Sequence, residues 1–286
     1  MKILVVGAGG FVGRNVTEYM CSKGHEVVAL GHKELDSTDS DAVRKCLEEG
    51  KFDLVLHYAV DGRRVEEAVD INMKMYQNFA NNSNLFGRMI YAGSGAEYGK
   101  QFDIKSVHEE EIGNVYPADW YGVGKYKINE LIRHSENIYS LRIFGLFGPG
   151  EGYATKYISG LCAKAIKDKP LSYQTDCYFD YLWIEDYCKM LDAFIQLENP
   201  KYHDYNIVSG KRIALSELAE IVREISGKDL EIIHYAEGLK NEYTASNDRL
   251  LAEIGEIEFT DIREAIEKLY HWYETQEIDE SLFLYQ

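Results

Sequence analysis

The chain has 286 residues, of which 45% are hydrophobic, and its formal net charge is −17. This acidic balance argues against DNA or RNA as a partner, because a surface that binds a phosphate backbone needs excess Lys and Arg. The five cysteines are scattered, odd in number and without C-x-x-C spacing, so neither a disulfide framework nor a metal site is expected. No apolar stretch is long enough to span a bilayer. We therefore expect a cytoplasmic protein with reduced thiols and no membrane partner.

Short apolar runs alternate with helical patterns through the first half of the chain. They predict strands at residues 3–6, 26–30, 54–58, 88–91 and 138–144, and helices at residues 12–23, 41–49, 65–83 and 121–134. Strands that alternate with helices indicate an α/β fold with a doubly wound parallel sheet of the Rossmann type and right-handed crossovers.

The pattern changes after a glycine-rich stretch at residues 148–152. The second half predicts strands at residues 171–173, 178–183 and 205–208, and helices at residues 156–167, 186–197, 215–225 and 261–275. The helix at 186–197 is expected to return to the first domain. We therefore expect residues 1–150 and about 176–200 to form the larger domain, and residues about 151–175 and 201–286 to form a smaller C-terminal α/β lobe.

Glycines follow the first predicted strand at a regular spacing. Gly7, Gly10 and Gly13 form a G-x-x-G-x-x-G motif directly after the apolar run at residues 2–6. Glycine keeps side chains out of a tight strand-to-helix turn, so a pyrophosphate can rest on backbone N–H groups at the positive end of the helix. The motif predicts that the larger domain binds a dinucleotide. The smaller lobe is then expected to bind the substrate.

The end of the second predicted strand bears on the choice of dinucleotide. A domain that uses NAD usually has Asp or Glu there, which accepts hydrogen bonds from the ribose hydroxyls. Here Gly31 is followed by His32 and Lys33, which would suit a 2′-phosphate, and Glu34 comes one step later. The sequence thus favours NADP(H) and leaves NAD(H) possible.

Three residues form a candidate catalytic group. Tyr121 and Lys125 are four residues apart on a predicted helix, so their side chains share one face. A nearby ammonium is expected to lower the pKa of a phenol from its usual value of about 10, and such a tyrosine can exchange a proton with an alcohol or alkoxide. Ser94 follows the strand at residues 88–91 and is placed to hydrogen-bond the reacting oxygen.

In this order and spacing, these features resemble the extended short-chain dehydrogenase/reductase family, also described as the NAD-dependent epimerase/dehydratase family. The resemblance covers essentially the whole chain and includes Leu141-Arg142-Ile143-Phe144 and the segment at residues 179–186. It is nearest to nucleotide-sugar 4-ketoreductases and epimerases of the GDP-fucose-synthase-like and surface-polysaccharide type. It implies that Ser94, Tyr121 and Lys125 are the catalytic triad. Besides the triad and the glycine motif, it implies cofactor contacts at Phe11, Val12, Asp36, Ser37, Tyr58, Ala59, Val60, Asn72, Ile143 and Phe144. The candidate cofactor contacts His32 and Lys33 come from the end of the second strand.

The resemblance implies hydride transfer at C4 of a nucleotide-activated sugar. The 4,6-dehydratases of the family carry Asp-Glu directly after the catalytic Ser or Thr, and the GDP-fucose synthases carry a Cys two residues after it. Gly95 and Ala96 occupy these positions here. We therefore expect reduction of the 4-keto group of a nucleotide-activated sugar or deoxysugar by NADPH, with Tyr121 as proton donor. An NAD-dependent nucleotide-sugar 4-epimerase and a non-catalytic NADP-sensing regulator are the alternatives.

The remaining expectations concern the substrate and partners. Candidate substrate contacts are Ser94, Gly95, Lys156 and Arg249, of which the two basic residues would hold the pyrophosphate. Arg142 lies inside an apolar strand, so its burial would require a paired acid. The resemblance also implies a homodimer that packs through the long helices at residues 65–83 and 121–134.

Overall fold

The computed structural model describes residues 1–285. Its larger part is a six-stranded parallel sheet with the strand order β10-β6-β4-β3-β1-β2. The strands are β1 (Lys2–Val6), β2 (Glu26–Leu30), β3 (Leu54–His57), β4 (Arg88–Ser94), β6 (Ile138–Ile143) and β10 (Asp204–Ile207). The chain adds β2 on one side of β1 and the later strands on the other, so the predicted doubly wound sheet is confirmed. Ligands of such sheets bind where the order reverses, at the carboxyl ends of the strands.

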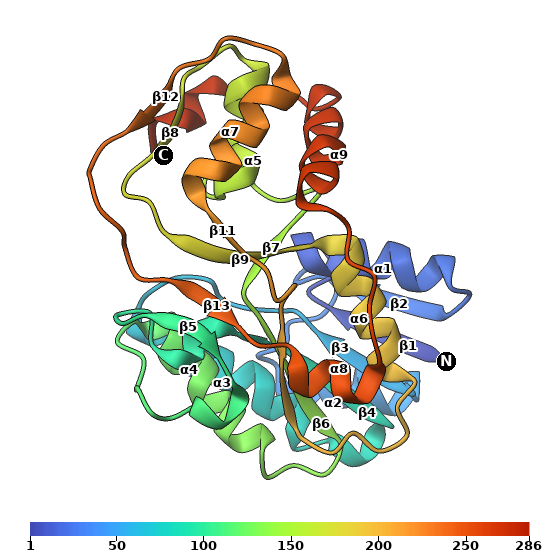
Figure 1. Cartoon of the computed structure of the whole chain (residues 1–286). Helices are drawn as coiled ribbons and strands as arrows, with labels where there is room; N and C mark the ends of the chain where they lie inside the picture. The colour runs from blue at the N-terminus through green and yellow to red at the C-terminus, as the bar shows by residue number, and fades with distance from the viewer. Residues whose placement is uncertain (286) are drawn as a thin grey trace.

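Helices cover both faces of this sheet (Figure 1). Helices α1 (Phe11–Ser22) and α6 (Ile184–Ile195) pack on the face of Ile3 and Val5, whereas α2 (Ser40–Gly50), α3 (Glu66–Ala80) and α4 (Trp120–Ile132) pack on the face of Leu4 and Val6. Side chains of a strand alternate between faces, so a strand covered on both sides is apolar throughout. These four β1 side chains are at most 1% exposed, and each buried side chain of this kind contributes about 1.5–3 kcal/mol.

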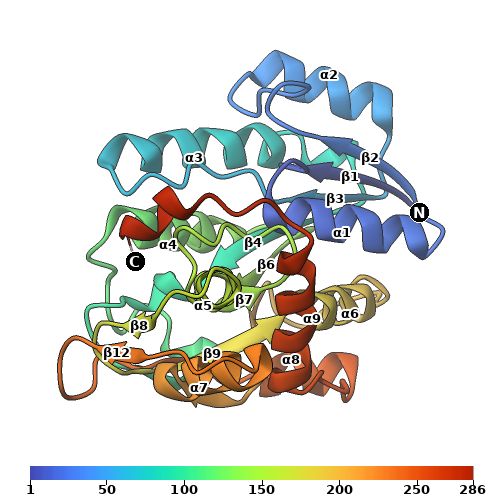
Figure 2. The same cartoon turned by 90° about the horizontal axis from the view of Figure 1, so that it is seen from above.

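The smaller lobe consists of three packed helices and a two-stranded pair. The helices are α5 (Tyr157–Ile166), α7 (Leu215–Ser226) and α9 (Ile262–Glu274), and the strands are β8 (Leu171–Tyr173) and β12 (Ile232–His234). A second sheet, in the order β11 (Arg212–Ala214), β9 (Tyr178–Trp183), β13 (Tyr243–Ala245) and β5 (Ile104–Val107), ties the lobe to the larger part, and β7 (Gly145–Phe147) also pairs with β9. In Figure 2 the lobe elements α7 and β12 lie on the side away from α2.

The boundary between the two parts differs from the predicted one. Strand β10 pairs with β6 in the six-stranded sheet, and α8 (Asp248–Ile254) packs on β10 and α6. Residues 204–207 and 248–254, predicted to lie in the lobe, therefore lie with the larger domain. A short buried strand has the same sequence pattern in either domain, so its pairing partner could not be predicted.

Strand β4 also extends beyond the predicted residues 88–91. Ala92, Gly93 and Ser94 continue the parallel pairing with β6, opposite Leu141, Arg142 and Ile143. Ser94 is thus the last residue of the strand and lies at the carboxyl edge of the sheet. Within residues 1–285, no helix is both long enough and apolar enough to cross a membrane.

Candidate active site

The glycine motif forms the turn between β1 and α1. Gly7 has a φ of +80°, and a Cβ there would lie 2.6 Å from the backbone nitrogen of Ala59. A Cβ at Gly13 would overlap the carbonyl oxygen of Gly7, so the turn and the neighbouring chain can approach only if both residues are glycine. Gly10 begins α1 without a side-chain cap. The first N–H groups of α1 are therefore free to bind an anion, which fits the pyrophosphate of a dinucleotide.

A cavity of about 470 Å³ extends from this turn to the end of β2. Eight residues that the sequence assigned to cofactor binding line it: Gly7, Gly10, His32, Asp36, Ser37, Tyr58, Ala59 and Val60. Lys33 is not among the lining residues. The Glu34 carboxylate accepts a hydrogen bond from the Gly31 nitrogen at 2.9 Å, and the Asp36 carboxylate accepts two from Thr38.

A second cavity, of about 560 Å³, continues from the same turn to the lobe. It brings together the predicted catalytic residues Ser94, Tyr121 and Lys125, which come from β4 and α4. The other predicted site residues that line it are Gly7, Gly10, Phe11, Val12, Gly13, Tyr58, Val60, Ile143, Phe144 and Lys156. The two cavities share the glycine turn, Tyr58 and Val60. Together they form one path along the carboxyl ends of the strands.

Lys125 is buried against β4. Its ammonium donates hydrogen bonds to the backbone oxygen of Ala92 at 2.6 Å and to the hydroxyl of Tyr91 at 3.0 Å. It also lies 5.9 Å from the centre of the Tyr121 ring. Burial lowers the pKa of Lys125 to about 8, although the nearby charge of Glu97 acts in the opposite direction. The ammonium is therefore held in a fixed place and titrates near physiological pH.

Tyr121 differs from the sequence-based expectation in its protonation. Burial raises its pKa, while a hydrogen bond with the Ser94 side chain acts to lower it. The expected decrease is absent because the cost of placing a phenolate in this buried position exceeds the effect of its partners. A tyrosine with a raised pKa stays protonated at neutral pH and is suited to donate a proton.

Tyr243 is a cavity residue that the sequence reasoning missed. It comes from β13 of the second sheet, is 5% exposed, and its hydroxyl lies near the Ser94 side chain, which acts to lower its raised pKa. Its ring centre lies 4.8 Å from that of Phe144, and the Lys100 ammonium lies 4.1 Å from its centre. No local motif marks Tyr243, because only the pairing of β13 with β5 and β9 brings it to the triad.

Glu151 is a second missed residue. Its carboxyl group lines the triad cavity, is almost fully buried and accepts a hydrogen bond from the Ser159 hydroxyl at 2.6 Å. Burial raises its pKa to about 7. Lys156, which the sequence proposed for the substrate, lies at the cavity with a half-exposed side chain 3.9 Å from Glu151.

Four predicted site residues line neither cavity: Lys33, Asn72, Gly95 and Arg249. The Asn72 side chain is hydrogen-bonded to the backbone of Asp61, at 2.8 and 3.0 Å, rather than to Lys125. Gly95 lies beneath Tyr243, where a Cβ would be 2.5 Å from the tyrosine hydroxyl oxygen. Arg249, predicted to hold a pyrophosphate, instead pairs with the carboxylates of Glu109, Glu110 and Asp204. Its charge is already balanced there, away from the triad cavity.

Comparison with known sequences agrees with this geometry. The sequence model described as the NAD dependent epimerase/dehydratase family matches residues 3–208. The chain is 22% identical to GDP-mannose 3,5-epimerase 1 of Oryza sativa subsp. indica, over 96% of this chain and 82% of that one. It is 24% identical to the UDP-glucose 4-epimerase of Corynebacterium glutamicum, over 93% of this chain and 94% of that one.

Solved structures show the same fold. The GDP-mannoheptose C4 reductase of Campylobacter jejuni, with NADP bound, has a TM-score of 0.82 at 19% identity, over 96% of this chain and 98% of that one. The GDP-L-fucose synthetase of Naegleria fowleri, bound to NADP, has a TM-score of 0.85 at 18% identity, over 96% of this chain and 92% of that one. Because the family model matches most of this chain, the chain belongs to the NAD dependent epimerase/dehydratase family.

Proposed function

We propose that the protein is an NADP(H)-dependent oxidoreductase that reduces the 4-keto group of a nucleotide-activated deoxysugar. The observation that carries the proposal is the meeting of Ser94, Tyr121 and Lys125 in a cavity that continues to the glycine turn. These are the residues that acid–base chemistry at a carbonyl needs: two hydroxyl groups for the oxygen and one buried ammonium beside them. The same three residues argue against a non-catalytic sensor, which has no use for an intact triad.

Each residue of the triad has a defined task in this reaction. A bound nicotinamide dinucleotide supplies the hydride for the carbonyl carbon. Ser94 and Tyr121 orient the carbonyl oxygen through their hydroxyl groups, and Tyr121 gives its proton to the oxygen as the alcohol forms. Lys125 stabilises the resulting phenolate by its charge, while its hydrogen bonds to β4 keep it in place. The glycine turn and the start of α1 would hold the pyrophosphate of this dinucleotide.

The end of β2 supports NADP(H) as the cofactor. Glu34, the acid nearest to this strand end, has its carboxylate bonded to the Gly31 nitrogen, so that oxygen is already engaged and less able to accept from a ribose hydroxyl. His32 lines the cavity at the same point. The reductase and synthetase structures named above contain NADP, which agrees with this assignment.

The 4-epimerase is the second candidate. It uses the same triad with retained NAD, and the UDP-glucose 4-epimerase of Corynebacterium glutamicum matches the chain over nearly its full length. The structure of the UDP-glucose 4-epimerase of Thermus thermophilus in complex with NAD also has this fold, with a TM-score of 0.78 to this chain. The two candidates differ in whether NADPH is consumed.

The test is to incubate the protein with NADPH and 4-keto-6-deoxy sugars carried on GDP, CDP, UDP or dTDP, and to follow NADPH absorbance. We expect consumption with at least one of them. Tyr121→Phe should abolish it, whereas Tyr126→Phe, on the same helix but outside the cavity, should not. If NADPH is never consumed and a nucleotide hexose is interconverted with NAD, the protein is the epimerase instead.

A further inference from the structure

Glu97 lies directly behind the catalytic residues. It belongs to the 3-10 turn Gly95–Tyr98 that follows β4, and its side chain is completely buried. One carboxylate oxygen accepts a hydrogen bond from the Ser94 nitrogen at 2.8 Å, and the other accepts one from the Arg142 Nε at 2.5 Å. The carboxylate therefore fixes the backbone at Ser94 and is itself fixed by Arg142.

Glu97 and Lys125 hold two ends of the same short segment. Lys125 donates to the oxygen of Ala92, and Glu97 accepts from the nitrogen of Ser94. Between them, a Cβ at Gly93 would lie 2.9 Å from a Glu97 carboxylate oxygen and 3.2 Å from Cγ of Arg142. The close packing leaves no space for a side chain, so the charged groups reach the strand only because residue 93 is glycine.

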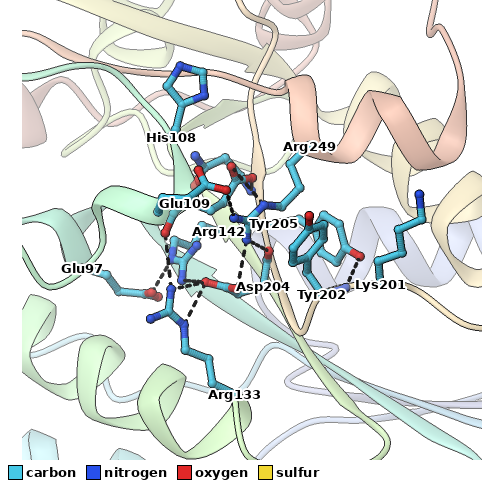
Figure 3. Close-up of polar contacts among 12 residues, drawn as sticks. Glu97, His108, Glu109, Arg133, Arg142, Lys201, Tyr202, Asp204, Tyr205 and Arg249 are labelled. Carbon is cyan, nitrogen blue, oxygen red and sulfur yellow. Dashed lines mark hydrogen bonds and ion pairs between the residues drawn. The ribbon is translucent and has the colours of Figure 1, made fainter.

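Figure 3 shows how this carboxylate is anchored. Arg142 pairs with both Glu97 and Asp204, and Asp204 also accepts from Arg133 at 2.9 Å. Arg249 of α8 pairs with Asp204 at 3.3 Å and continues the network to the exposed rim. Three arginines thus face the buried carboxylates of Glu97, Asp204 and Glu109, with Glu110 at the exposed end. A buried charge is tolerated when it is paired in this way.

We propose that Glu97 is a positioning residue of the catalytic centre, which holds the Ser94 backbone and places its negative charge near Lys125. In the reaction that the inference presupposes, the reduction proposed above, Glu97 touches neither substrate nor cofactor. Its charge favours the ammonium form of Lys125 and the neutral form of Tyr121. Burial raises the pKa of Glu97 itself, whereas the charge of Arg142 acts to lower it. The other titratable or charged groups around Glu97, Lys125 and Tyr121 are Tyr91, Tyr98, Arg142, Tyr243, His57, Asp119 and Arg64. His57 is neutral because burial lowers its pKa to about 3.

Removal of the Glu97 charge should shift the pKa values of Lys125 and Tyr121 in a defined direction. Without it, the protonated forms of both Lys125 and Tyr121 become less stable, so both pKa values fall. Reduction needs both groups protonated. The alkaline limb of the kcat profile should therefore move to lower pH in Glu97→Gln, which a merely structural role of Glu97 would not cause.

The decisive experiment measures the Lys125 titration in protein carrying 13C at lysine Cε, with the signal assigned by its loss in Lys125→Met. We expect a wild-type midpoint near 8 and a fall of about half a pH unit or more in Glu97→Gln. Glu110→Gln, at the exposed end of the same network, should leave the midpoint unchanged. An unchanged midpoint in Glu97→Gln would overturn the inference. Because this titration needs no substrate, it decides the role of Glu97 independently of the proposed reaction.

Glu97→Asp distinguishes the contact with the Ser94 nitrogen from the effect of the negative charge. It also replaces Glu97→Gln as the test if that variant does not fold. The shorter side chain keeps the charge but withdraws from the Ser94 nitrogen. We expect kcat to fall about tenfold with the NADPH affinity and the alkaline limb unchanged. A wild-type kcat in Glu97→Asp would show that the contact with Ser94 does not position the site.

Discussion

Replacement of Arg142 by Met tests how the buried charges are balanced. Arg142 is fully buried and pairs with Glu97 and Asp204, whose side chains are 0% and 6% exposed. In the variant, Asp204 retains its ion pairs with Arg133 and Arg249. Glu97 is therefore the carboxylate that is mainly affected by the loss of the Arg142 charge. Removal of one partner of a buried ion pair costs about 3–5 kcal/mol, which is a large share of a total stability of about 5–15 kcal/mol.

Urea unfolding followed by circular dichroism measures this loss. With an m-value of about 3 kcal/mol/M, the unfolding midpoint of Arg142→Met should fall by about 1–1.7 M. The matched control is Arg263→Met, because Arg263 pairs with Glu224 where both side chains are about half exposed, and such a pair contributes less than about 1 kcal/mol. Equal midpoints for the two variants would show that the buried network does not stabilise the fold as described.

Three further predictions concern the cofactor turn, the lysine and the missed tyrosine. Gly13→Ala should weaken NADPH binding by about tenfold or more in calorimetric titration, because the new Cβ meets the turn, whereas a Cβ at Gly152 meets nothing within 4 Å and Gly152→Ala should bind normally. Since Lys125 must be protonated and its pKa is lowered to about 8, the kcat for reduction should be constant below that pH and decline above it; a profile flat to pH 10 would contradict this role. Tyr243→Phe removes the hydroxyl group that lies near Ser94, so kcat should fall about tenfold in steady-state assays without a change in NADPH affinity, and an unaltered kcat would exclude Tyr243 from the reaction.

Much of the fold could be predicted because its signals are local. The apolar run of β1, the glycines after it and the alternation of strands and helices depend on neighbours in sequence. The short strands of the second sheet could not be predicted in this way. Strand β13, at residues 243–245, pairs with β5, at residues 104–107, and nothing in either segment specifies a partner so distant in the chain.

The residues of the candidate site could likewise be predicted where the sequence carries a recognisable motif. Ser94, Tyr121 and Lys125 were predicted from their order and spacing, and the structure places all three at one cavity. Glu97 had a detectable signal, since Ser94-Gly95-Ala96-Glu97 has the spacing of a capping box, which the structure contains. The buried Arg142 was correctly expected to have a paired acid.

The prediction for Arg249 rested on its positive charge alone. A basic residue in an acidic chain was expected to hold a substrate phosphate, but the structure surrounds it with carboxylates of the protein itself. Its partners lie far away in sequence, so spacing could not reveal them. The homodimer implied by the resemblance stays a prediction.

The proposed reduction can be tested by following the hydride from NADPH to C4 of the sugar. The protein is incubated with NADPH that carries deuterium at the transferable position of C4 and with the 4-keto-6-deoxy nucleotide sugar that it turns over. We expect one deuterium at C4 of the sugar for each NADPH consumed, and none when Tyr121→Phe replaces the wild type. A product free of deuterium, formed without net loss of NADPH, would contradict the proposed reduction.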